Sequence, residues 1–448
     1  MSASPKGYGS GAAVLSAGIG VTGLVTYAYF ALASYALDDR AYGGVTLLWS
    51  AVFIVVSVLY RPVEQLLSRT IAERATRGQR GGAPVRVAMQ VQLALAVGFA
   101  LLALAFRGPL EQGLLGGSAA LYWVLVVAVL AYAASYFARG FLAGHRRFGL
   151  YGGLVLMESL SRALFALAVA LGIAHGQVAV ALGIAAAPIV SLAVVPWALG
   201  RRLLTPAVDA DGGASARAAA LDAAAGGEPV GGDTEFTLAN GAGFAAAVLL
   251  IMIAEQTFLN AGPLIVYATS GVEGAALAGL VFNVLLIARA PLQLFQAIQT
   301  SILPHLTSLR ASGQVDPFRR SVQLTLVATA AFAALVALAL LAVGPAVMDL
   351  VFEDEFSYGR PGLVLVAVGM GLYLAAATLN QAALARGAAR AAAGCWLASA
   401  GAFVALLLAP GFDDRVLQVQ IAFAGGAAAL CALLYALYRR ADPPQPPA

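Results

Sequence analysis

The sequence predicts an all-α integral membrane protein with twelve transmembrane helices in two six-helix bundles. Three observations predict it: the composition, a series of long apolar runs, and a polar segment near the middle of the chain. Of 448 residues, 61% are hydrophobic and 11% charged, and the mean hydropathy is +0.86, whereas soluble domains carry roughly 25% charged residues. Because one bilayer crossing takes about 20 apolar residues, this length holds about a dozen crossings and leaves no room for a large soluble domain.

The predicted spans are runs of apolar residues with few or no charges. An even number of spans places both termini on the same side of the membrane. The twelve runs cover residues 12–37, 42–60, 87–106, 119–138, 150–174, 177–199, 236–268, 274–303, 321–343, 362–385, 391–409 and 416–438.

The basic residues orient these spans. Twenty of the 26 lie in segments on the same side as the N-terminus, and two more, Arg162 and Arg289, lie within spans. Cytoplasmic loops carry the excess of Lys and Arg, so we expect both termini to be cytoplasmic. Topology alone accounts for the basic excess, so no nucleic-acid partner is expected. On the opposite side are only Arg40, Arg107, Arg360 and Arg415.

The segment 201–235 divides the chain. It is rich in Ala, Gly and Asp and has no apolar periodicity, which is typical of a flexible linker. We therefore expect an N-terminal six-helix lobe (1–200), a cytoplasmic linker, a C-terminal six-helix lobe (236–438) and a cytoplasmic tail (439–448).

Two local resemblances relate the lobes. LYRPVEQLLS (59–68) at the end of span 2 is similar to IARAPLQLFQ (287–296) in span 8, and FLAGHRR (141–147) after span 4 is similar to LARGAAR (384–390) after span 10. The matches fall at equivalent places in the two halves. This is typical of parallel repeats related by an axis along the membrane normal.

Charged residues inside spans are the first functional candidates, because such a group costs at least ~2.5–3.5 kcal/mol at the centre of a bilayer. Glu158 and Arg162 lie four residues apart on one helical face, which predicts a buried ion pair. Glu255 has no oppositely charged partner in its own span and begins a polar run with Gln256 and Asn260. We expect it to have a functional role, the alternative being a protonated carboxyl group in a hydrogen bond between helices.

Polar stripes mark spans 2 and 8. A stripe along one side of a membrane helix must face protein or water, so these two spans are expected to line a shared central space. For Arg61 the alternative is snorkelling at the interface, because it ends its apolar run. The stripes are Arg61, Glu64 or Gln65, and Ser68 in span 2, and Arg289, Gln293, Gln296 and Thr300 in span 8.

Enzymatic, metal and redox chemistry find no support in the sequence. The histidines His145, His175 and His305 form no catalytic or metal-ligand pattern with other residues. Both cysteines, Cys395 and Cys431, lie in apolar runs, so neither a disulfide framework nor a zinc site is expected. We expect a protein that is not an enzyme and holds no metal or organic cofactor.

Four segments carry a family resemblance that covers nearly the whole chain: YRPVEQLLSRTIAE (60–73), ARGFLAGHRRFGLYG (138–152) followed by Glu158, ARAPLQLFQAIQTSILPHLTSL (288–309) and LNQAALARGAAR (379–390). With them the sequence resembles the multidrug/oligosaccharidyl-lipid/polysaccharide (MOP) superfamily, in particular its polysaccharide (O-antigen type) flippase branch. The resemblance implies a MATE-like fold, with two six-helix lobes around a central cavity that opens alternately to either membrane face.

The resemblance also implies a function: translocation of a polyprenyl-pyrophosphate-linked oligosaccharide across the bacterial cytoplasmic membrane for cell-surface polysaccharide biosynthesis. Arginine suits pyrophosphate through its fork of donors, so Arg289 and Arg61 are the expected pyrophosphate ligands. Glu255 is expected to bind a coupling proton or sodium ion, the alternative being a structural ion pair between Glu255 and Arg289. Span 7 is expected to bend at Gly262-Pro263. Expected partners are the lipid-linked glycan, the bilayer and the glycan polymerase machinery. Sugar hydroxyls are assigned to Gln293, Gln296, Gln299 and Asn260.

Two alternatives stay open. A drug/cation antiporter of the same superfamily would line its cavity with carboxylates and aromatic rings rather than with arginine and glutamine. A membrane-embedded glycan polymerase or glycosyltransferase would need a catalytic external loop larger than any in this sequence.

Overall fold

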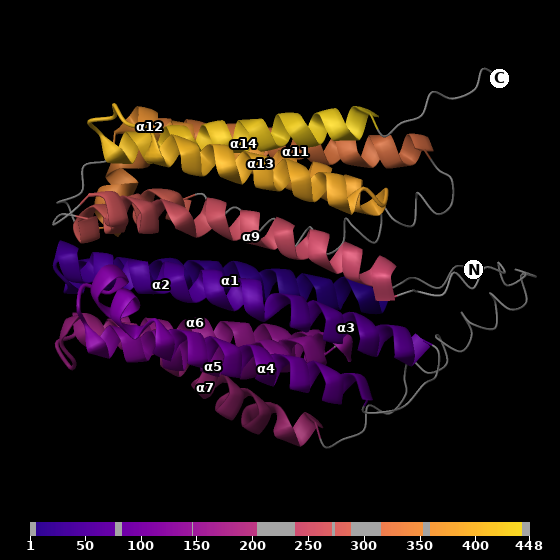
Figure 1. Ribbon diagram of the computed structural model, residues 1–448, viewed down its shortest axis with the longest axis horizontal. Helices are drawn as coiled ribbons and strands as arrows, with labels where there is room; N and C mark the ends of the chain where they lie inside the picture. The colour runs from indigo at the N-terminus through magenta and orange to yellow at the C-terminus, as the bar shows by residue number, and fades with distance from the viewer. Residues whose placement is uncertain are drawn as a thin grey trace, which may run out of the picture.

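The computed structural model of the chain is a bundle of helices that run roughly parallel to one long direction (Figure 1). The structure describes residues 6–76, 83–145, 147–203, 238–270, 274–287, 315–352 and 359–440. The elements are α1 (Lys6–Ala36), α2 (Asp39–Leu59), α3 (Arg61–Thr76), α4 (Ala83–Ala105), the short π-helix η1 (Pro109–Leu114), α5 (Ala119–Gly144), α6 (Phe148–Ala170), α7 (Gly176–Leu203), α9 (Leu238–Thr269), α11 (Val315–Val351), α12 (Arg360–Ala385), α13 (Ala389–Leu408) and α14 (Arg415–Arg440), with a further apolar helix at Gly274–Ile287.

These helices confirm the prediction of an all-α, multi-pass membrane protein. Within the described part of the chain, ten helices are long and apolar enough to cross a bilayer. The first predicted span coincides with α1, and the described part of the eighth is the helix Gly274–Ile287. The other predicted runs each coincide with one long helix. The cytoplasmic placement of the termini remains a prediction, although α1 begins and α14 ends on the same side of the bundle (Figure 1).

One helix was not expected as a separate element. The apolar run of span 2 ends at Tyr60, yet the chain continues as α3. Its apolar residues Val63 and Leu67 are buried and pack with Ala88 of α4, so α3 is amphipathic rather than lipid-facing. Pro62 is tolerated because it lies in the first turn of α3, where backbone N–H groups have no partner within the helix. Span 2 is thus a long helix with a junction at Tyr60.

The helices form two halves, which we call the N-terminal half (α1–α7) and the C-terminal half (α9–α14 with the helix Gly274–Ile287). In Figure 1 they lie one below the other, with α9 at the boundary. Within the N-terminal half, α6 packs on α1 and α7; within the C-terminal half, α12 packs on α11 and α14, and α13 on α9 and α14. The predicted linker 201–235 lies outside the described residues after Leu203, where α7 ends. The exact domain boundaries therefore stay a prediction.

Aromatic clusters fill the interior of both halves. In the N-terminal half, Phe30 meets Trp49 edge to face with ring centroids 4.9 Å apart. In the C-terminal half, Phe258 stacks on Phe403 at 5.1 Å and meets Tyr373 at 5.8 Å. Such rings fill volume and interact favourably in offset or edge-to-face geometry. The rings of both halves belong to one continuous cluster of buried apolar side chains.

The described parts of spans 2 and 8 are neighbours, whereas the polar stripe of span 8 lies outside the described residues, so the shared central space stays a prediction. The Tyr42 hydroxyl of α2 donates to Asn283 Oδ1 of the helix Gly274–Ile287. Gly43 lies directly against the backbone of Ala275, where a Cβ atom would not fit. The two halves therefore touch through the first turns of α2.

Further contacts between the halves come from the C-terminal third of α1. The Tyr27 hydroxyl donates to the carbonyl oxygen of Leu286 at 2.6 Å, and the Tyr35 hydroxyl donates to that of Leu350 at 2.8 Å. The Phe30 ring lies 4.5 Å from that of Phe282. The contacts of Tyr35, Tyr42 and Gly43 lie toward the end of the bundle where α1 ends and α2 begins, which the charge bias predicts to be external. The halves also pack against each other through α2 and α9, and just beyond the last residue of α2 a contact between charged residues joins them.

Candidate functional site

Arg61 lies at the junction of α2 and α3. Tyr60 caps α2 with φ −106° and ψ −28°, and the next position but one is Pro62, which cannot donate a backbone hydrogen bond. The Glu64 amide donates to the Tyr60 carbonyl at 3.0 Å and carries the helix across the junction. Discontinuities of this kind in membrane helices are where transporters commonly place binding groups. The side chain of Arg61 is 31% exposed.

Glu255 of α9 faces Arg61 from the other half. Arg61 Nη1 lies 3.9 Å from Glu255 Oε1, and the Glu255 side chain is 21% exposed. We call these two residues the interlobe pair. The distance is that of an ion pair but exceeds a hydrogen bond, and neither side chain hydrogen-bonds to another described residue. The pair therefore leaves guanidinium donors and carboxylate lone pairs open to a ligand.

Tyrosines and one further carboxylate surround the interlobe pair. Glu64 lies one turn beyond Arg61 on α3 and accepts a hydrogen bond from the Tyr151 hydroxyl at 3.0 Å. Tyr136 is also within electrostatic reach of Arg61. From the C-terminal half, Tyr373 lies near both Arg61 and Glu255, and its buried hydroxyl has no hydrogen-bond partner among the described residues.

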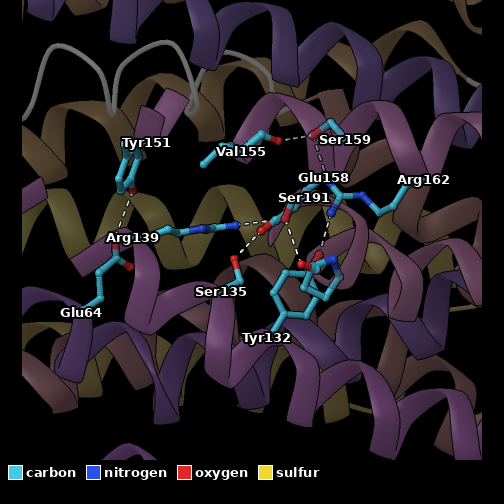
Figure 2. Close-up of polar contacts among 11 residues, drawn as sticks. Glu64, Tyr132, Ser135, Arg139, Tyr151, Val155, Glu158, Ser159, Arg162 and Ser191 are labelled. Atoms are coloured by element: carbon cyan, nitrogen blue, oxygen red, sulfur yellow. Dashed lines mark hydrogen bonds and ion pairs between the residues drawn. The ribbon is translucent and has the colours of Figure 1, made fainter. Parts of the chain in front are cut away.

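A second charge pair lies inside the N-terminal half (Figure 2). Arg139 of α5 donates to Glu158 Oε2 of α6, and the Ser135 hydroxyl donates to Glu158 Oε1. We call Arg139 and Glu158 the core pair. The Glu158 side chain is 2% exposed and both its oxygens accept hydrogen bonds, so this carboxylate has no open side.

The predicted ion pair between Glu158 and Arg162 is therefore corrected. Both side chains are buried as expected, but Arg162 Nη1 donates to the Tyr132 hydroxyl at 2.7 Å and Nη2 to Ser159 Oγ at 2.9 Å. The guanidinium carbon lies 5.0 Å from the Trp49 ring centre, a cation–π contact. Helical spacing allowed the pairing, but α5 supplies Glu158 with a basic partner from across the helix interface.

Close helix packing holds α3, and with it Arg61, against the N-terminal half. A Cβ atom at Gly140 of α5 would lie 2.8 Å from the Glu64 carbonyl oxygen, and one at Gly144 would lie 2.7 Å from Ile71 Cβ. Small residues four apart let membrane helices approach in this way. Gly140 and Gly144 thus fix the helix that carries Arg61.

The structure brings together some of the predicted site residues. Arg61 and Glu255, predicted for separate roles, form the interlobe pair. Asn260 is buried and its amide donates to Gln256 Oε1 at 2.9 Å; its role in sugar binding stays a prediction. Arg289, Gln293, Gln296 and Gln299 lie outside the described residues.

Three residues near these pairs were missed by sequence analysis. Arg139 directly follows the apolar run 119–138, which predicts a loop residue, but α5 continues to Gly144. The signal for this continuation is the pair of glycines four residues apart, Gly140 and Gly144. Tyr151 and Tyr373 carry no signal in the sequence, because a tyrosine in an apolar span usually packs as a hydrophobic residue. Only its position beside the interlobe pair distinguishes Tyr373.

Comparison with known proteins gives matches in structure only. No protein-family model matches the chain, and no curated protein sequence matches it. Among solved structures, a mutant of the MATE transporter VcmN from Vibrio cholerae is 16% identical, with a TM-score of 0.60 and 97% of each chain covered.

Two further matches represent two states of a transporter. An inward-facing conformation of a multidrug resistance MATE family transporter of the MOP superfamily is 14% identical, with a TM-score of 0.61 over 93% of this chain and 94% of that one. The outward-facing conformation of a transporter so described is 13% identical, with a TM-score of 0.61 over 96% and 95%. At this identity the similarity establishes the architecture: the protein is an all-helical, multi-pass membrane protein with the MATE-like fold.

Proposed function

We propose that the protein is an alternating-access transporter that moves a polyprenyl-pyrophosphate-linked oligosaccharide from the inner to the outer leaflet of a bacterial cytoplasmic membrane, for cell-surface polysaccharide biosynthesis. The observation that carries the proposal is Arg61: a partly exposed guanidinium at the boundary between two helical halves, with no hydrogen bond to the described residues and only a long contact to Glu255.

Alternating access is supported by the distribution of contacts between the halves. The hydrogen bonds of Tyr42 with Asn283 and of Tyr35 with Leu350 join the halves toward one end of the bundle, and α2 and α9 pack against each other at the boundary. Movement of two rigid halves about such a region exposes a site at the boundary to one membrane face at a time. The fold is similar to structures described as inward-facing and outward-facing.

An anionic substrate is supported by the chemistry of Arg61. A pyrophosphate diester carries two negative charges, and guanidinium provides several donors in a planar fork that matches phosphate oxygens. In the proposal Arg289 joins Arg61 at the pyrophosphate, while Asn260 binds sugar hydroxyls. Glu255 binds the coupling proton or sodium ion. Further sugar ligands are Gln293, Gln296 and Gln299.

A drug/cation antiporter is the second candidate, favoured by the carboxylates and aromatic rings at the boundary. Glu255 lies near Tyr373, and Glu64 bonds Tyr151. Carboxylates attract lipophilic cations, and aromatic faces bind them. In that case Glu255 is the substrate ligand, and Arg61 is its counter-ion in the empty protein.

Flipping by the purified protein in proteoliposomes tests the proposal. We expect inner-to-outer movement of a polyprenyl-pyrophosphate-linked oligosaccharide, a loss of at least about tenfold in Arg61→Gln, and wild-type flipping in the matched control Arg107→Gln. Arg107 is a half-exposed arginine paired with Glu111 at 2.9 Å, away from the boundary site. Proton-driven uptake of tetraphenylphosphonium without lipid flipping would instead establish the antiporter, and lengthening of the glycan would establish a polymerase.

A further inference from the structure

We infer that the interlobe pair makes the binding of an anionic substrate at Arg61 and of a proton or metal cation at Glu255 mutually strengthening. The inference rests on the proposed function, because it takes the substrate to be an anion. It goes further by specifying how the two binding events influence each other, and in which direction.

The first step is the state of the two side chains. Arg61 and Glu255 are 3.9 Å apart, partly exposed, and without hydrogen bonds to other described residues. Among the described residues, each is therefore the nearest opposite charge to the other, and each is partly exposed. An anion that approaches Arg61 competes with Glu255 for the same guanidinium.

The second step is the set of titratable groups around the pair. On the N-terminal side these are Glu64, Tyr136 and Tyr151, and the Glu64 carboxylate already accepts the Tyr151 hydrogen bond. On the C-terminal side it is Tyr373. The helices packed against α9 are α2, α13, α14 and η1, together with Gly274–Ile287, whose Leu285 lies against Gly262. Among the described residues of these helices, no basic side chain forms an ion pair with Glu255. When Arg61 turns to an anion, none of these groups offers Glu255 a positive charge.

The third step is the fate of the released carboxylate. A negative charge that binds beside a carboxylate disfavours the ionised form of that carboxylate, so Glu255 takes up a proton or a metal cation more readily when the anion binds Arg61. In reverse, a neutralised Glu255 releases Arg61 and removes the anion's competitor. Equilibrium coupling between two sites is reciprocal, so each ligand strengthens the binding of the other by the same factor.

The direction of coupling also separates the two candidate functions. An anion and a proton bind different members of the pair, so their coupling is positive. A cationic drug and a proton both bind Glu255, so their coupling is negative. Neutralising Glu255 is therefore expected to strengthen the binding of an anion and to weaken that of a lipophilic cation.

The test measures direct binding of farnesyl pyrophosphate and of tetraphenylphosphonium to the purified full-length protein by calorimetry at pH 5.5 and pH 8, with and without sodium. Wild type should bind farnesyl pyrophosphate more tightly in acid or in sodium, within the roughly 5- to 150-fold range of such couplings. Glu255→Gln should bind farnesyl pyrophosphate tightly under every condition. Any pH dependence that remains in this variant comes from protonation of farnesyl pyrophosphate itself. Arg61→Gln should bind weakly throughout, and the control Glu111→Gln, a carboxylate of similar exposure that pairs with Arg107, should follow wild type.

Each contrary result has its own meaning. Equal farnesyl pyrophosphate affinity and equal pH response in wild type and Glu255→Gln would overturn the coupling but leave an anion transporter. Weaker anion binding in Glu255→Gln would also overturn the coupling. No farnesyl pyrophosphate binding in wild type, with tetraphenylphosphonium bound, would overturn the proposed function and the inference together. If Glu255→Gln does not fold, Glu255→Asp, which withdraws the carboxylate from Arg61, is expected to bind the anion more tightly than wild type and to keep a pH response.

Discussion

The two charge pairs of the molecule differ in what surrounds them. The core pair, Arg139 and Glu158, is buried, bonded directly and supported by Ser135. The interlobe pair, Arg61 and Glu255, is partly exposed and 3.9 Å apart. Both pairs consist of one arginine and one glutamate, so the difference in burial and distance does not come from the residue types.

The difference follows from which helices carry the partners. Arg139 and Glu158 lie on α5 and α6 of the same half (Figure 2), so direct hydrogen bonds between them join helices of one unit. Arg61 and Glu255 lie in different halves, so under the proposed alternating access their contact breaks when the halves separate. In that proposal a strong bond would hold the protein in one state, whereas a long ion pair does not.

The largest loss of stability is expected when the core pair is broken. Glu158→Ala leaves the Arg139 guanidinium buried without its carboxylate, and such uncompensated charges destabilise proteins by about 3–5 kcal/mol. Thermal unfolding of the detergent-purified protein should show a large loss. The control Glu111→Ala removes the half-exposed contact with Arg107 and should change stability by only about 0–1 kcal/mol. Equal losses in both variants would show that the core pair is not structural.

A smaller effect is expected where α3 meets α5. Gly140→Ala places a methyl group 2.8 Å from the Glu64 carbonyl oxygen, and overpacking of this kind costs about 1–3 kcal/mol. Because α3 carries Arg61, anion binding should weaken as well. Gly98→Ala in α4 meets no atom within 4 Å and should be neutral or slightly stabilising. Unchanged unfolding and binding in Gly140→Ala would argue against α3 being fixed by this contact.

These two regions also show how far the sequence could predict the structure. The spans follow from composition, because each bilayer crossing requires a long apolar run. The continuation of α5 to Arg139 was missed, because the apolar window ends where polar side chains begin to face protein rather than lipid. The continuation of span 2 was anticipated by its polar stripe through Ser68, but the junction at Tyr60 was not. A run of apolar residues shows where a helix can face lipid, but it does not show whether the helix continues beyond the run.

A single sequence does not show which side chains on different helices contact each other. Helical spacing placed Glu158 and Arg162 on one face, but it carries no information on the neighbouring helix that brings Arg139 to Glu158. Likewise Glu255 was predicted as functional from the cost of its charge and Arg61 from the polar stripe of span 2, whereas their contact depends on how the halves are placed against each other.

Removing a single hydrogen bond beside the interlobe pair should have a modest effect. Tyr151→Phe deletes the 3.0 Å bond to Glu64, and bonds of this kind contribute about 0.5–1.5 kcal/mol. The freed Glu64 carboxylate then competes for Arg61 one turn away, so farnesyl pyrophosphate should bind more weakly. Tyr435→Phe, at a side chain 48% exposed on α14, is the matched control. Loss of stability without any loss of anion affinity would show that Tyr151 does not influence Arg61.

The smallest effect on stability is expected at the interlobe pair itself. Arg61→Gln and Glu255→Gln each remove one charge of a partly exposed pair that lacks a direct hydrogen bond, so unfolding should shift by no more than about 1 kcal/mol. Flipping should nevertheless be lost in Arg61→Gln, since the substitution removes the proposed anion ligand. The double variant restores charge balance, and under the proposal it does not restore flipping, because no guanidinium returns. Normal flipping by the double variant, measured in the same proteoliposomes, would mean that the two side chains only neutralise each other, and the interlobe pair would then belong with the core pair as part of the scaffold.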